Sequence, residues 1–103
     1  MGRNSPCDAD QLEAQVEKHF CEAVSAAGGV ERKIVYLQRR GCSDRLVGFP
    51  FNRLFLVELK RPRGGRISPH QQEDERYWAQ VGVQKVYLHT IAAVNQWVSR
   101  VRA

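Results

Sequence analysis

The chain has 103 residues, of which 43% are hydrophobic and 26% charged, a composition that excludes a fibrous or disordered protein and fits one compact domain. Its net charge is +5, and ten basic residues against two acidic ones fall between Arg32 and Arg66, which indicates a polyanionic partner. No apolar run approaches the roughly 20 residues of a spanning helix, and the first residues lack the apolar core of a signal peptide. A cytoplasmic protein without membrane association is therefore expected.

Residues 1–8 are expected to be a loose N-terminus, and 9–103 a single domain. Apolar residues recur at helical spacing from Ala9 to Ala27, and Gly28-Gly29 supplies a stop signal. The segment Val30 to Leu37 contains the β-branched and aromatic run Ile34-Val35-Tyr36. The sequence thus predicts a helix followed by a strand.

Two apolar-rich runs come next, Asp44 to Phe49 and Arg53 to Lys60, with the turn Pro50-Phe51-Asn52 between them. This pattern predicts an antiparallel hairpin. The segment Arg61 to Arg66 that follows is rich in Arg, Pro and Gly and is expected to be a cationic loop.

Capping signals mark the last helices. Ser68-Pro69-His70-Gln71 has the pattern of a capping box with Pro in the first turn, which predicts a helix to about Val81. Gly82 then precedes a predicted strand from Lys85 to His89, and Thr90 is the expected N-cap of a final helix. The predicted order is αβββαβα, an α/β fold.

The three cysteines, Cys7, Cys21 and Cys42, form an odd set without short paired spacing. This pattern argues against a disulfide framework and against a zinc knuckle. We expect reduced thiols without a catalytic role.

The acidic residues of the basic middle segment, Asp44 and Glu58, stand at the start of one predicted strand and near the end of its neighbour. Alternation along a strand places Glu58 and Lys60 on the same face. Two carboxylates can bind Mg²⁺ or Mn²⁺, and a nearby ammonium can orient a water for phosphodiester hydrolysis. The simpler alternative is that Glu58 and Lys60 form the solvated face of an edge strand.

The spacing Asp44-x(13)-Glu58-x-Lys60 resembles the motif of PD-(D/E)XK nucleases, and its surroundings resemble the virus-type replication-repair nuclease (VRR-NUC) family. The resemblance covers nearly the whole chain, in this order: Glu17, Gly28-Gly29, Lys33, Arg40 to Val47, Val57 to Arg61 and Ser68 to Gln71. One position departs from the family, because Ser43 stands where a proline usually precedes the metal-binding aspartate. Loop stiffness is affected there, but the carboxylate remains.

The resemblance implies a restriction-endonuclease-like fold, with a small mixed sheet flanked by helices, and a metal-dependent DNA endonuclease. Its implied metal ligands for Mg²⁺ or Mn²⁺ are Asp44, Glu58 and the backbone carbonyl of Leu59, while Lys60 handles the attacking water. The stand-alone, phage-type members it resembles imply a homodimer and branched or junction DNA as substrate.

Two further residues resemble family positions, and each has an alternative. The glutamate of the first helix falls on Glu17, although Glu13 lies one turn earlier on a similar face. Gln71 matches the glutamine of the second helix, although its capping-box role would account for it equally.

A set of basic residues surrounds the predicted centre and could bind phosphates without reading bases. These candidate DNA contacts are Lys33, Arg39, Arg40, Arg45, Arg61, Arg63 and Arg66. The alternatives from other functional classes are a non-catalytic DNA-binding module and a structural partner in a replication or repair assembly.

Overall fold

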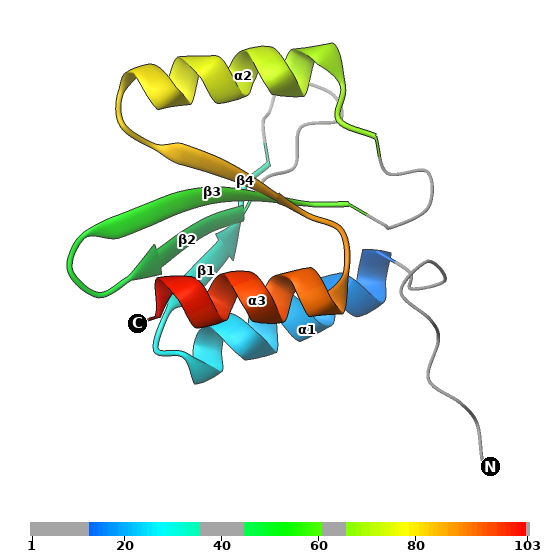
Figure 1. Cartoon of the computed structure of the whole chain (residues 1–103), viewed down its shortest axis with the longest axis vertical. Coiled ribbons are helices and arrows are strands. Elements are labelled where there is room, and N and C mark those ends of the chain that lie inside the picture. Colours follow the sequence, from blue (N-terminus) through cyan, green and yellow to red (C-terminus); the bar gives the residue numbers. More distant parts are fainter. Residues whose placement is uncertain (1–12, 36–44, 61–65, 103) are drawn as a thin grey trace.

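The computed structural model describes residues 13–35, 45–60 and 66–102, in which three helices and four strands follow the predicted order αβββαβα. Figure 1 shows a sheet between two helical layers, with two helices on one face and one on the other. The mixed sheet flanked by helices confirms the predicted α/β fold. The elements are α1 (Glu13–Ala26), β1 (Val30–Lys33), β2 (Arg45–Phe49), β3 (Arg53–Leu59), α2 (Pro69–Gln80), β4 (Gln84–Leu88) and α3 (Ile91–Val101).

The sheet has the strand order β1-β2-β3-β4. β1 pairs with β2 and β2 with β3 in antiparallel orientation, whereas β3 and β4 are parallel, so α2 is the crossover that parallel pairing requires. The ends of β3 and β4 meet at one edge of the sheet, where Leu59 lies opposite Leu88. Because β2 runs the other way, its first residue, Arg45, lies close to this edge, opposite Val57. Residues from β2 and β3 that are distant in sequence are thereby brought together.

The hydrophobic core fills the space between the sheet and the pair α1 and α3. Phe20 of α1 and Trp97 of α3 stack with ring centroids 6.1 Å apart, and Phe55 of β3 meets Trp97 edge-on at 5.2 Å. Val57 and Leu59 of β3 point into the same core. The strand alternation then turns Glu58 to the opposite face, towards α2.

Two glycines end α1 and allow the chain to approach the sheet. Gly28 has φ +83°, and the amide of Gly29 donates to the carbonyl of Val24 at 2.9 Å, as in a Schellman motif. A Cβ on Gly29 would lie 2.9 Å from the side chains of Phe49 and Val24. Gly28 is therefore needed for its backbone conformation and Gly29 for its lack of a side chain.

The first strand is shorter than predicted. β1 ends at Lys33, opposite Arg45, whereas the prediction extended it through Ile34 and Val35 to Leu37. Val35 is 69% exposed. A run of β-branched residues forms a strand only where a neighbouring strand pairs with it and one of its faces is buried. Residues 36 and 37 lie outside the described part of the chain.

Two other strands differ from the predictions by one residue. β3 ends at Leu59 rather than Lys60. β2 is described from Arg45 to Phe49, and Asp44, its predicted first residue, lies outside the described part of the chain. β4 runs from Gln84 to Leu88 instead of Lys85 to His89. The antiparallel pairing of β2 and β3 confirms the predicted hairpin.

The turn of this hairpin places a bulky residue in an unfavourable backbone conformation. Phe51 has φ 70° and Asn52 has φ 61°, so both lie in the left-handed region. Asn adopts this region readily, whereas a bulky residue there costs about 1–2 kcal/mol. The Phe51 side chain is 92% exposed and gains little from burial.

We therefore expect Phe51→Asn to raise the free energy of unfolding by about 1 kcal/mol, because Asn accepts the left-handed conformation and no buried contact is lost. Denaturant unfolding followed by circular dichroism measures this change. Phe51→Val is the matched control, since a β-branched residue should be no better than Phe in this conformation. A decrease in stability with Asn would mean that the Phe51 ring makes a stabilising contact.

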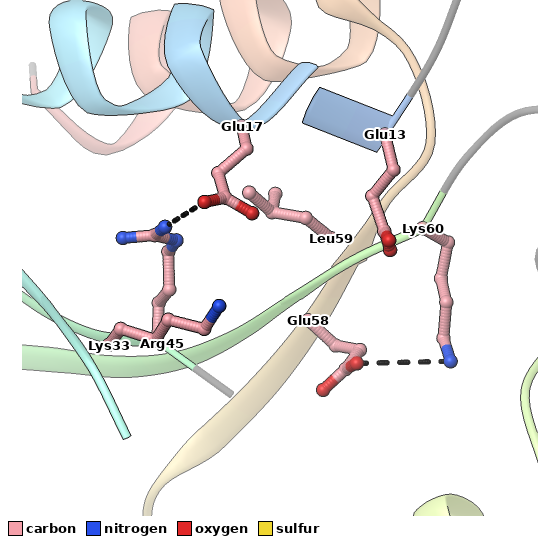
Figure 2. Close-up of a pocket in the computed structure, with 7 residues that line it drawn as sticks. All are labelled: Glu13, Glu17, Lys33, Arg45, Glu58, Leu59 and Lys60. Carbon is pink, nitrogen blue, oxygen red and sulfur yellow. Dashed lines mark ion pairs between the residues drawn. The ribbon is translucent and has the colours of Figure 1, made fainter. Parts of the chain in front are cut away.

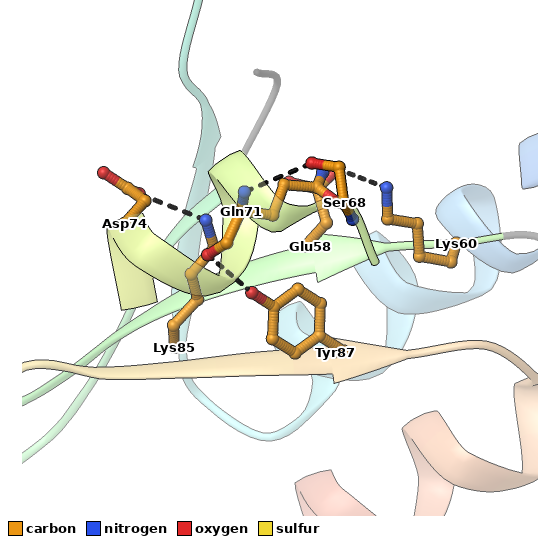
Figure 3. Close-up of polar contacts among 7 residues, drawn as sticks. All are labelled: Glu58, Lys60, Ser68, Gln71, Asp74, Lys85 and Tyr87. Atoms are coloured by element: carbon orange, nitrogen blue, oxygen red, sulfur yellow. Dashed lines mark hydrogen bonds and ion pairs between the residues drawn. The ribbon is translucent and has the colours of Figure 1, made fainter. Parts of the chain in front are cut away.

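Polar contacts hold α2 on the sheet. The Ser68 side chain accepts from the Gln71 amide, and the Gln71 side chain accepts from the Ser68 amide, so the predicted capping box is present. The Tyr87 hydroxyl of β4 donates to the Gln71 carbonyl at 3.0 Å, and Lys85 donates to Asp74 at 3.1 Å (Figure 3).

Within the described ranges, neither α2 nor the other two helices combine the length and apolar character needed to cross a membrane.

Candidate active site

Glu58 and Lys60 project together from the end of β3. Glu58 is 5% exposed, and Lys60 follows the last residue of the strand. The Lys60 Nζ lies 3.8 Å from Oε1 of Glu58 (Figures 2 and 3). The second carboxylate oxygen, Oε2, is buried. A solvated pair on an edge strand would be exposed, so the simpler alternative for Glu58 and Lys60 does not fit this geometry.

Asp44, the other predicted metal ligand, lies outside the described residues. In the sequence it directly precedes Arg45, the first residue of β2. Arg45 lies opposite Val57, which directly precedes Glu58. β2 therefore begins beside the strand that carries Glu58 and leads to Lys60.

A pocket of about 260 Å³ opens where these strands meet α1 (Figure 2). Three of its lining side chains are carboxylates and three are cationic, so acids of the kind that bind metals and cations suited to phosphate line the same pocket. The residues that line it are Glu13, Glu17, Lys33, Arg45, Glu58, Leu59 and Lys60.

Both candidates for the acid of α1 line this pocket, so the choice between Glu17 and Glu13 stays a prediction. The Glu17 carboxylate contacts the pocket's Arg45 at 2.8 Å, and its side chain is 40% exposed. Glu17 is thus oriented by a cation, which favours it as the better ordered of the two acids.

Arg45 lies in an ion-pair cluster that the sequence did not predict. One guanidinium nitrogen, Nη2, contacts Glu17, and the other, Nη1, contacts Oε1 of Glu31 at 2.5 Å. Glu31 lies on β1 and its partner Val47 on β2, and alternation places Glu31 and Arg45 on the same face of the sheet. Glu31 and Arg45 carry opposite charges on neighbouring predicted strands, which is the signal for such a pair. The sequence did not give the register of the two strands, so the pair could not be predicted from it.

The residues predicted to contact DNA lie in different surroundings. Lys33 lines the pocket, and Arg66 is exposed at the start of the segment that leads into α2. Arg45, in contrast, is only 9% exposed and holds two carboxylates, which leaves it poorly placed for a DNA phosphate. Four further predicted contacts lie outside the described residues: Arg39, Arg40, Arg61 and Arg63.

Gln71 is 4% exposed and faces the sheet from α2. Its side-chain oxygen is engaged with the Ser68 amide, and its carbonyl accepts from Tyr87, which lies opposite Glu58 in the sheet (Figure 3). The capping-box interpretation is therefore confirmed. Gln71 is hydrogen-bonded to Tyr87, the neighbour of Glu58 on β4, but Gln71 is not among the residues that line the pocket.

The donor set fits a hard divalent cation. The carboxylates of Glu58 and Glu17 are oxygen ligands of the kind that Mg²⁺ and Mn²⁺ prefer, and the lining residues include neither Cys nor His. Among the residues that the structure describes, no three His, Cys, Asp or Glu side chains gather closely enough to hold a metal. The set thus needs a further ligand, and Asp44 is the candidate that the sequence supplies.

Cys21 is a free thiol on α1 near this cluster. Burial raises the pKa of the Cys21 thiol above its ordinary value, and the nearby Arg45 guanidinium opposes this shift. A raised pKa keeps the sulfur protonated at neutral pH, and the thiol is a poor nucleophile. This agrees with the expectation that Cys21 has no catalytic role.

Comparison with known proteins places the chain in a family. No family model matches the sequence. A protein named "Putative nuclease p44", from Acyrthosiphon pisum secondary endosymbiont phage 1, is 36% identical over 76 residues, which are 74% of this chain and 81% of that protein. A solved structure named VRR_NUC domain superposes with a TM-score of 0.75 and 28% identity, covering 84% of this chain and 94% of that one. Sequence and fold agree, and the chain belongs to the VRR-NUC family of nucleases.

Proposed function

We propose that the chain is a Mg²⁺- or Mn²⁺-dependent endonuclease that hydrolyses DNA phosphodiester bonds. The observation that supports this most directly is that Glu58 and Lys60, which contact each other at the end of β3, line one pocket with the carboxylates of α1. A carboxylate, an ammonium group and further acids within one small pocket are what metal-assisted phosphodiester hydrolysis requires.

Glu58, Asp44 and the Leu59 carbonyl would hold the cation, with Glu17 as the acid from α1. When bound, the cation would neutralise the scissile phosphate and lower the pKa of a coordinated water. The Lys60 ammonium, kept near Glu58 at 3.8 Å, would orient the attacking water and stabilise negative charge that develops on the phosphate. Lys33 and Arg66, together with Arg39, Arg40, Arg61 and Arg63, would bind the DNA backbone by charge, which favours recognition of DNA shape over base sequence.

We further propose that the working unit is a homodimer acting on branched DNA. One chain supplies one centre and therefore makes one cut, whereas symmetric cleavage of two strands needs a second centre. A two-fold pair of chains provides it.

The test is cleavage of a panel of labelled substrates, namely linear duplex, flap, fork, nicked duplex and four-way junction, in Mg²⁺, in Mn²⁺ and in EDTA. We expect metal-dependent cleavage with branched substrates cut fastest, and light scattering at about twice the 11.8 kDa chain mass with and without junction DNA. Binding of DNA without cleavage under any metal would indicate a non-catalytic binding module. A monomer that still makes paired cuts would exclude the dimer.

A further inference from the structure

We propose that Arg45 is a positioning residue that orients the Glu17 carboxylate for the metal, with Glu31 fixing the guanidinium in turn. This inference rests on the proposed metal-dependent function and assigns new roles to Arg45 and Glu31. The guanidinium of Arg45 is buried and shared between two carboxylates.

The guanidinium of Arg45 uses its two ends for two different acids. Nη2 contacts Oε1 of Glu17 at 2.8 Å, and Nη1 contacts Oε1 of Glu31 at 2.5 Å. The Arg45 side chain is 11% exposed and that of Glu31 is 23% exposed, so solvent screens this pair weakly. The planar fork of arginine fixes the relative position of both partners, which a single ammonium group could not do.

Only one oxygen of Glu17 is used in this contact. Figure 2 shows the other oxygen directed away from Arg45, towards the middle of the group of lining residues. Glu17 is the more exposed partner, with 40% of its side chain accessible, so it keeps access to the pocket while Arg45 sets its direction. A ligand held in this way loses less conformational freedom when a cation binds.

The second acid balances the charge. Arg45 alone would add a positive charge beside the site and repel a divalent cation. Glu31, on β1, balances this charge through the other guanidinium nitrogen and keeps the guanidinium in place. Arg45 is also the first residue of β2, so the same ion pairs hold the start of this strand.

The test is a double-mutant cycle on Mn²⁺ affinity, measured by calorimetry on the DNA-free full chain. Arg45→Lys keeps the charge and removes the fork, and we expect it to weaken Mn²⁺ binding roughly ten-fold, as loss of an outer-shell partner typically does. In the Glu17→Gln background the same change should weaken binding less than two-fold, because Arg45 acts through Glu17. Arg53→Lys, at the other end of β3, is the matched control and should leave Mn²⁺ affinity unchanged.

Glu31→Gln provides a second, milder variant that leaves Arg45 in place. We expect it also to weaken Mn²⁺ binding, by several-fold, because the guanidinium loses its anchor and its balancing charge. Thermal unfolding of each variant shows whether weaker Mn²⁺ binding is caused by a loss of folded protein. The positioning role would be overturned if Arg45→Lys weakened Mn²⁺ binding equally in the parent and in the Glu17→Gln background. It would also be overturned if Arg45→Lys and Glu31→Gln were both folded and both bound Mn²⁺ with the parental affinity. A parent chain that neither binds Mn²⁺ nor cleaves DNA would instead overturn the proposed function, and this inference with it.

Discussion

Glu58→Gln is expected to abolish metal-dependent cleavage while leaving the chain folded. Loss of an outer-shell partner at a metal site already costs about 10- to 100-fold, so loss of a direct carboxylate ligand should lower turnover by more than about 100-fold. Glutamine has nearly the same shape as glutamate and fits the buried position, where Glu58 is 5% exposed. Asp44→Asn should have the same effect.

Stability should respond in the opposite direction to activity. Glu58 shares its pocket with Glu13 and Glu17, and the neutral amide removes repulsion among these carboxylates. The loss of the Lys60 contact at 3.8 Å offsets part of this gain, so we expect an unfolding midpoint equal to or slightly above that of the parent.

The measurement pairs cleavage rates in Mg²⁺ and Mn²⁺ with thermal unfolding followed by circular dichroism. Glu22→Gln, on the exposed side of α1, is the matched control and should cut at the parental rate. A Glu58→Gln protein that is folded and still cuts as fast as the parent would refute the proposed centre.

Lys60→Met is expected to lower turnover by about 10²- to 10³-fold, the range found for groups that transfer protons or stabilise charge in a transition state. DNA affinity should change less than about three-fold, because the proposed phosphate contacts are made by other basic residues and not by Lys60. Lys60→Arg should not restore turnover, since a guanidinium is larger and does not give up its proton.

Single-turnover cleavage and DNA binding in Ca²⁺, measured on the same variants, separate these effects. Lys18→Met removes an exposed lysine from α1 and is the control for general charge loss. Equal losses of affinity and turnover for Lys60→Met would assign Lys60 to binding instead of chemistry.

The sequence by itself determined most of the local structure. The capping box at Ser68 and Gln71, the N-cap at Thr90 and the hairpin between β2 and β3 follow from short-range chemistry, and the structure confirms all three. Strand alternation likewise brought Glu58 and Lys60 to one face without any knowledge of the fold, because a side-chain period of two depends only on the backbone. The family also followed from motif spacing.

Tertiary structure alone decided what depends on register and burial. β1 ends at Lys33 because strand length is set by pairing with a neighbour, and the β-branched residues beyond it could not reveal where that pairing stops. Arg45 was predicted to contact DNA, since an arginine beside an acidic motif has the charge for it. Its burial between Glu17 and Glu31 depends on how α1 packs over two strands, and no spacing along the chain encodes that distance.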